Sequence, residues 1–141
     1  ETFCLSVQCT GQHSLIGTDQ GMFLYDLDVE SQTPSKILFS EDPVVDASWN
    51  PHRSHHDLIA SVAQGGVCLW SAGSDSHPLQ TKFSTPNVNG VAWSTFHPTT
   101  FATHSANDCR IWDTRKPKKY AYSMDTMGIG DCSLLRWNPN Q

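Results

Sequence analysis

Three tryptophans at equal spacing constrain the fold of this chain more than any other feature. Trp49, Trp93 and Trp137 lie 44 residues apart, each at the end of a short segment with related composition. A repeat of about 20 to 50 residues indicates a chain built from copies of one unit, each burying its apolar surface against its neighbours. The 141-residue sequence is therefore expected to fold as a row of similar units.

Each repeat contains short apolar segments separated by tight turns, and this order predicts four β-strands. Residues 58–63 and 101–106 are rich in small and apolar side chains, and both end at polar turns that predict hairpins. A third strand follows each turn and ends in Trp70 or Trp112. Fourth strands are predicted after loop-like connections, over residues 36–40, 80–84 and 119–123.

The first repeat follows the same order. Residues 5–9, 14–18 and 22–26 predict its first three strands, with Cys9 and Tyr25 where the later repeats have tryptophan.

Together these units predict an all-β fold, a WD-repeat β-propeller with about three four-stranded antiparallel blades. The blades are expected at residues 4–41, 44–85 and 88–124, with an extra first strand of a fourth blade at 132–138. Propellers close with about four to eight blades, so we expect an incomplete propeller, either a fragment or a chain covered by another protein. Five tryptophans are expected to be structural: Trp49, Trp70, Trp93, Trp112 and Trp137.

Composition excludes several other classes of protein. The sequence contains no apolar stretch of the roughly 18 residues that a membrane-spanning helix needs. Its five cysteines are odd in number and irregularly spaced, which disfavours a disulfide scaffold and indicates a reducing compartment. The net charge of −5 disfavours a nucleic-acid partner, although residues 71–141 carry more basic than acidic side chains.

Several motifs carry a resemblance to a known family. The segment Trp112-Asp113-Thr114-Arg115 resembles a WD repeat directly. Residues 6–13, 49–52 and 111–117 resemble, in that order, the N-terminal propeller of the WD repeat-containing protein 59 family.

The resemblance implies a subunit of a GATOR-type (SEA-type) complex, which relays amino-acid sufficiency to the target-of-rapamycin kinase. It also implies a cytoplasmic protein that reaches the lysosomal or vacuolar surface through its complex. Its partners would be other protein subunits, with no cofactor and no small-molecule substrate.

The polar bracing of a regular WD repeat is expected to be incomplete here. The connections before the second and third blades contain no histidine, and Gln64 and Asn107 lie roughly where an aspartate is expected. Ser105, Asn107 and Trp112 are expected to retain part of this hydrogen-bond network, so the blades should depend more on packing.

Three kinds of side-chain cluster suggest more specific functions: a histidine cluster, pairs of carboxylates and a basic run. His52, His55, His56 and Asp57 have zinc-like spacing, but no cysteine lies nearby, so a solvated loop is favoured and no metal is expected. The pairs Glu41–Asp42 and Asp26–Asp28 could supply catalytic carboxylates, yet no nucleophile or phosphate loop accompanies them. The chain is therefore expected not to be an enzyme.

The run from Arg115 to Lys119 places four basic side chains within five residues. It could contact an acidic protein, a lipid surface or RNA. The Trp112-Asp113-x-Arg115 motif also resembles one that docks substrate receptors onto a cullin-RING ligase adaptor, so this alternative stays open.

The predicted topology places partner-binding residues on two opposite rims. One rim is acidic to neutral, and the other is basic. The residues expected to bind partners are Asp19, Glu41, Asp42, Gln64, Asn87 and Asn107 on the first rim, and Arg115, Lys116, Lys118 and Lys119 on the second.

Overall fold

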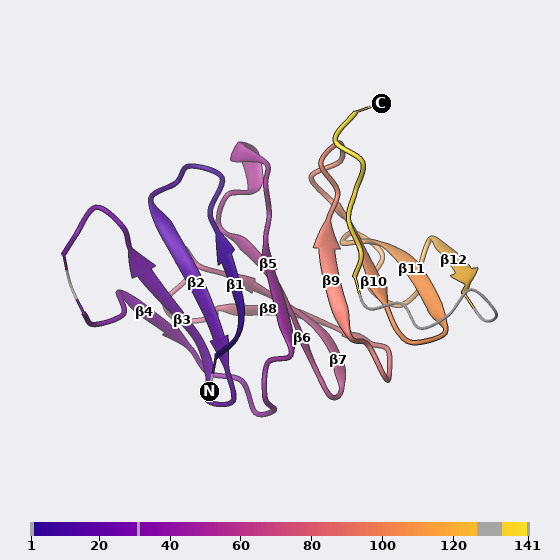
Figure 1. Ribbon diagram of the computed structural model, residues 1–141, viewed down its shortest axis with the longest axis horizontal. Coiled ribbons are helices and arrows are strands. Elements are labelled where there is room, and N and C mark those ends of the chain that lie inside the picture. Colours follow the sequence, from indigo (N-terminus) through magenta and orange to yellow (C-terminus); the bar gives the residue numbers. More distant parts are fainter. Residues whose placement is uncertain (1, 31, 127–133, 141) are drawn as a thin grey trace.

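The chain forms three four-stranded antiparallel sheets that stand side by side (Figure 1). This computed structural model describes residues 2–30, 32–126 and 134–140. The helical structure in these ranges is one short 3₁₀ turn, η1 (Arg53–His55). The all-β fold with antiparallel four-stranded units is therefore confirmed.

Within each sheet the four strands follow one another in sequence order. The first strands of neighbouring sheets contact each other, and the fourth strands lie at the outer edge. The first sheet contains β1 (Thr2–Val7), β2 (His13–Thr18), β3 (Gly21–Asp26) and β4 (Lys36–Leu38). The second contains β5 (Asp46–Trp49), β6 (Leu58–Ala63), β7 (Gly66–Ser71) and β8 (Leu79–Ser84). The third contains β9 (Gly90–Trp93), β10 (Thr100–His104), β11 (Asp108–Asp113) and β12 (Tyr122–Asp125).

Two apolar cores lie between the sheets, one at each interface. Leu15, Met22 and Leu38 of the first sheet pack against Trp49 and Trp70 of the second. Because each core needs side chains from two sheets, no sheet can bury its apolar surface alone, as expected for repeat units.

The second core lies between the second and third sheets and is rich in aromatic rings. Phe83 packs edge-on against Phe101 and Trp112, with ring centroids 5.1 and 5.5 Å apart. Trp93 packs against Phe101 at 5.5 Å.

The 44-residue repeat appears in the structure as a recurring hydrogen bond between neighbouring repeats. The indole Nε1 of Trp93 donates to the carbonyl oxygen of Ser48, the residue before Trp49, at 3.0 Å. In the same way, Trp137 donates to the carbonyl oxygen of Ala92, the residue before Trp93, at 3.0 Å. The spacing of the tryptophans thus reflects one contact made at successive interfaces.

A second recurring bond joins a polar side chain at the end of a first strand to the next repeat. The amide of Gln8 donates to the carbonyl oxygen of His56 at 2.9 Å, and that of Asn50 donates to Pro98 at 2.8 Å. Gln8 and Asn50 are both buried, which makes these bonds part of the interface.

The first repeat departs from its predicted alignment. Gln8 and Asn50 make equivalent contacts, so the residue equivalent to Trp49 is Val7, not Cys9. β1 ends at Val7, and Cys9 lies in the turn that follows, where Gly11 N–H donates to the Gln8 carbonyl at 2.9 Å. The prediction was wrong because the connection after the first strand is shorter in this repeat.

Two other strand predictions also need correction. The last strand of the third sheet is Tyr122–Asp125 instead of 119–123, because the chain first turns where Lys119 N–H donates to the Lys116 carbonyl. The extra strand expected over 132–138 lies partly outside the described residues, and Cys132 lies wholly outside them. Its described part, 134–138, forms no strand, since a first strand takes its ladder from the second strand of its own blade and none is present among the described residues.

Candidate interaction surfaces

Part of the WD-type polar bracing is present, although with a different partner from the one predicted. Trp70 Nε1 donates to the hydroxyl of Ser61 at 2.8 Å, and Trp112 Nε1 donates to Thr103 at 3.0 Å, both within buried surroundings. The partner of Trp112 is thus Thr103 on the adjacent strand, and not Ser105. Ser105 instead donates to Asp108 within the hairpin turn at 2.8 Å.

The first rim, defined by the turns after β2, β6 and β10 and the connections before β5 and β9, carries the predicted acidic to neutral residues. Asp42 on this rim is half-buried, and the other predicted residues are exposed: Asp19, Glu41, Gln64, Asn87 and Asn107. Asn87 holds a left-handed backbone with φ of 61°, a conformation that asparagine tolerates better than most residues.

The turn that presents Asn107 is braced by an ionic network to the second sheet. The Arg110 guanidinium pairs with Asp108 at 2.6 Å and donates to the hydroxyl of Thr85 at 2.8 Å. It also lies over the ring of Tyr120, 5.3 Å from the centroid. This network could not be predicted from the sequence, because nothing near Arg110 distinguishes it from other strand residues.

The second rim lies at the opposite ends of the strands and includes η1 and the connection between β11 and β12. The basic side chains predicted to bind partners are exposed there: Arg115, Lys116, Lys118 and Lys119. Their exposure leaves them available to a partner.

Arg115 differs from the three lysines because its charge is engaged within the chain. Its guanidinium contacts both carboxylate oxygens of Asp113, with the shortest distance 2.6 Å. This bidentate contact lowers the pKa of Asp113 to about 2. A ligase adaptor that recognises Arg115 would have to compete with Asp113.

We expect this pair to be visible in a titration. The pKa of Asp113 is depressed in the folded chain, so its stabilising contribution is present above about pH 4 and is lost as the pH falls toward 2. Replacing Arg115→Gln should return the pKa of Asp113 toward its ordinary value. Carbon-detected NMR of the carboxyl group measures both values, and an Asp113 that titrates near 4 in the unmodified protein would contradict the pairing.

The histidine-rich connection between β5 and β6 does not gather its side chains around one point. His52 Nε2 lies 2.9 Å from the carbonyl oxygen of Ser94, whereas His56 Nδ1 lies 3.0 Å from that of Arg53. Across residues 2–30, 32–126 and 134–140, no group of three histidine, cysteine or acidic side chains is placed to hold a metal ion.

Two of the described cysteines, Cys4 and Cys68, have raised thiol pKa values. Burial, followed by the nearby Asp46 charge, raises the pKa of Cys4 to about 11, and burial also raises that of Cys68. Such thiols stay protonated at neutral pH and are poor nucleophiles. Asp26 accepts a hydrogen bond from the Asp28 backbone at 2.9 Å, which is a turn contact.

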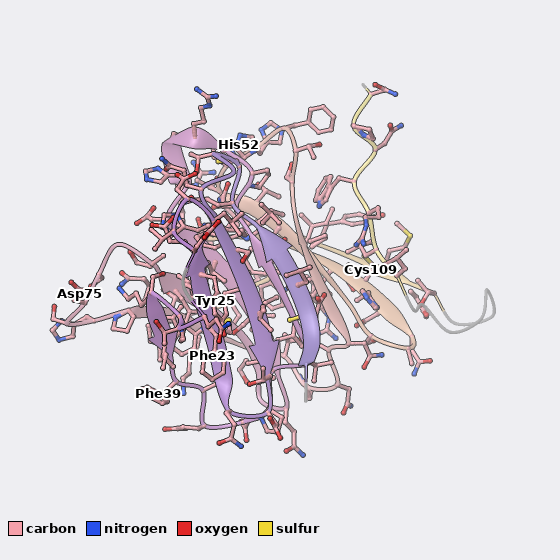
Figure 2. The ribbon with its side chains drawn as sticks, turned by 60° about the vertical axis from the view of Figure 1, so that its left-hand side comes forward. Phe23, Tyr25, Phe39, His52, Asp75 and Cys109 are labelled. Carbon is pink, nitrogen blue, oxygen red and sulfur yellow. The ribbon has the colours of Figure 1, made fainter. Side chains whose placement is uncertain are left out.

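The outward face of the first sheet is apolar and has no neighbouring sheet among the described residues. Cross-strand pairing places Leu5, Ile16, Phe23 and Ile37 in one row across all four strands. Figure 2 shows Phe23 and Tyr25 on this sheet, on the side turned forward. Leu5 is 67% exposed, which marks a face suited to packing against a further unit.

No helix within the described residues is long and apolar enough to cross a membrane.

Comparison with known proteins gives relatives along nearly the whole chain. GATOR2 complex protein WDR59 of Gallus gallus is 26% identical over 138 residues, and the human WDR59 is 25% identical over the same length. Maintenance of telomere capping protein 5 of Saccharomyces cerevisiae is 26% identical over 140 residues. Each alignment includes 95% of this chain.

The chain spans only a small share of these relatives, 14% of each WDR59 protein and 12% of the yeast protein. No family model matches the sequence. The resemblance to WD repeat-containing protein 59 is nevertheless confirmed, and the chain is similar to WDR59 over nearly its whole length, with three sheets arranged as consecutive blades of an incomplete WD-repeat β-propeller.

Proposed function

We propose that this chain is a non-catalytic scaffold for protein-protein contacts within a multi-subunit complex of the GATOR2 type. The observation that carries the proposal is the similarity to WDR59 along 95% of the chain. Rigid sheets that present polar side chains on two exposed rims support it, because binding residues commonly lie on loops held by a fixed framework.

The motif resemblance to the WD repeat-containing protein 59 family extends the proposal: the complex would regulate amino-acid signalling to the target-of-rapamycin kinase. The chain would then reside in the cytoplasm and reach the lysosomal or vacuolar surface with its complex. Its partners would be other protein subunits, and no small-molecule substrate or cofactor is needed for this role.

The native mass of the endogenous protein tests the scaffold role. A tagged protein in a gently prepared lysate should elute with a mass well above its own, and its other components should be proteins. A mass equal to that of the protein alone, measured by light scattering at physiological salt, would argue against a stable complex.

The second rim is expected to contribute to binding through charge. Reversing two exposed side chains, Lys118→Glu with Lys119→Glu, should slow association with the purified subunits about tenfold at low ionic strength, because steering by charge acts on the association rate. Biolayer interferometry measures this rate, and the melting temperature should stay unchanged.

The matched control is the same pair of measurements at high ionic strength. Salt screens exposed charges, so the two association rates should then become equal. Equal rates for the double variant and the unmodified protein at low ionic strength would remove the second rim from the interface.

A further inference from the structure

A groove lies along the outer edge of the first two sheets and reaches the first rim at Glu41 and Asp42. It has a volume of ≈ 910 Å³ and is lined by the end of β4, residues 39–42, strands β7 and β8, and residues 75–78 of the connection between them. In Figure 2, Phe39 and Asp75 mark the same side of the molecule. The volume falls within the roughly 300–1,000 Å³ typical of ligand pockets.

The groove exists because β4 is short. This strand has three residues, whereas its counterpart β8 has six, so the chain leaves the first sheet at Phe39 before it can cover β7 and β8. Trp70 and Leu79 are consequently left as part of the groove lining.

The far wall of the groove is fixed by one lysine. Lys36 Nζ, on β4, donates to the carbonyl oxygens of Ala72 and Ser74 at 2.7 and 2.6 Å and to the Asp75 carboxylate at 3.0 Å. These three bonds tie the connection between β7 and β8 to the first sheet. The groove is therefore formed before any partner binds, which lowers the entropy cost of binding.

The lining combines apolar side chains with an excess of negative charge. Phe39 is 76% exposed and Ile37 39% exposed, an unusual degree of exposure for neighbouring large apolar side chains. Three carboxylates line the groove, those of Glu41, Asp42 and Asp75, against one ammonium group, that of Lys82.

The charges also remain accessible. The side chains of Glu41 and Asp75 are 92% and 97% exposed, and the Lys82 ammonium stands 4.0 Å from Glu41, so its pairing is weak. Asp75 is also paired with Lys36 at 3.0 Å, so the three carboxylates face two ammonium groups and one negative charge remains in excess. A partner with basic side chains would meet this excess beside an apolar floor.

From this arrangement we propose that the groove binds a peptide segment of a partner protein that combines apolar anchor residues with lysine or arginine. A chain segment fits better than a small enclosed ligand, because covering Phe39 requires a molecule that extends beyond the hollow. β4 is moreover the outermost strand of the first sheet, so an extended segment can pair with its backbone. The proposal adds a second binding site to the scaffold and does not depend on the type of complex.

The test is a selection of random 16-residue peptides displayed on phage against the purified protein, followed by fluorescence anisotropy of the enriched peptides. The expected sequences combine Leu, Ile or Phe with Lys or Arg. Phe39→Ser and, independently, Leu79→Ser should each weaken binding about tenfold, as truncation of an anchor contact does. Glu41→Gln with Asp42→Asn should weaken binding and reduce its salt dependence, while the bonds of Lys36 that fix the wall stay in place.

The matched control is Tyr122→Ser, which removes an exposed aromatic side chain from the distant strand β12 and should leave binding unchanged. Melting temperatures of all variants should stay near that of the unmodified protein, since the replaced side chains lie at the surface. Absence of enriched peptides or enrichment of acidic peptides would overturn the proposal. It would also be overturned if the Phe39→Ser and Leu79→Ser variants both bound the peptides as tightly as the unmodified protein does. Because the probes are peptides, these outcomes are independent of whether GATOR2-type subunits bind.

Discussion

Replacing Trp93→Ala should lower the free energy of unfolding by about 3–5 kcal/mol, the usual loss for a large aromatic side chain removed from a core. Trp93 is 3% exposed and lies between the second and third sheets, where its ring packs on Phe101. The substitution also removes the indole that donates to Ser48, one of the recurring bonds between repeats. Urea denaturation followed by circular dichroism measures the loss.

Two further variants separate the contributions at this position. Trp93→Phe keeps an aromatic ring but loses the N–H donor. Its free energy of unfolding should therefore fall between that of the unmodified protein and that of Trp93→Ala. Tyr122→Ala, at a side chain 55% exposed, should change stability by less than about 0.5 kcal/mol. An unshifted unfolding curve for Trp93→Ala would mean that the tryptophan repeat does not mark the blade interfaces.

The second large effect is expected at the start of β7. Gly66 has φ of +130°, and a Cβ there would lie 2.2 Å from the Phe83 carbonyl oxygen and 2.9 Å from the Thr85 nitrogen. Both are backbone atoms of the neighbouring outer strand and its end, so relief requires a shift of the sheet edge. Gly66→Ala should therefore combine strain of about 1–3 kcal/mol with an overpacking cost of similar size.

The adjacent glycine is a matched control for this prediction. A Cβ at Gly65 would meet no atom within 4 Å, so Gly65→Ala should change stability by less than about 0.5 kcal/mol. Thermal unfolding of the two variants side by side gives the comparison. Equal melting temperatures would show that β8 does not approach Gly66 as closely as the structure places it.

The sequence was sufficient to predict the architecture because the repeat is marked by large, distinctive side chains. Trp49 and Trp93 can be aligned without a structure, and the hairpin at Gln64-Gly65 is evident from its turn residues. The first repeat was misaligned because Val7 replaces the tryptophan and nothing local distinguishes it from other strand residues.

The surfaces were harder to predict than the fold. Exposed rim residues such as Lys118 and Asn107 follow from the strand order alone. The groove beside Phe39 depends on β4 being three residues long and on the contacts of Lys36 with a connection nearly 40 residues away, and neither is visible in the local sequence. Bonds such as that from Gln8 to His56 could have been suspected only from the Trp49-Asn50-Pro51 segment, whose asparagine occupies the equivalent place.

The most direct test of the scaffold assignment is cross-linking mass spectrometry of the endogenous protein purified with its partners. The account predicts co-purification of other GATOR2-type subunits, with cross-links to partners from the lysines of the second rim, Lys116, Lys118 and Lys119. Recovery of the protein without other subunits, or with an RNA-binding assembly or a ligase adaptor instead, would contradict it.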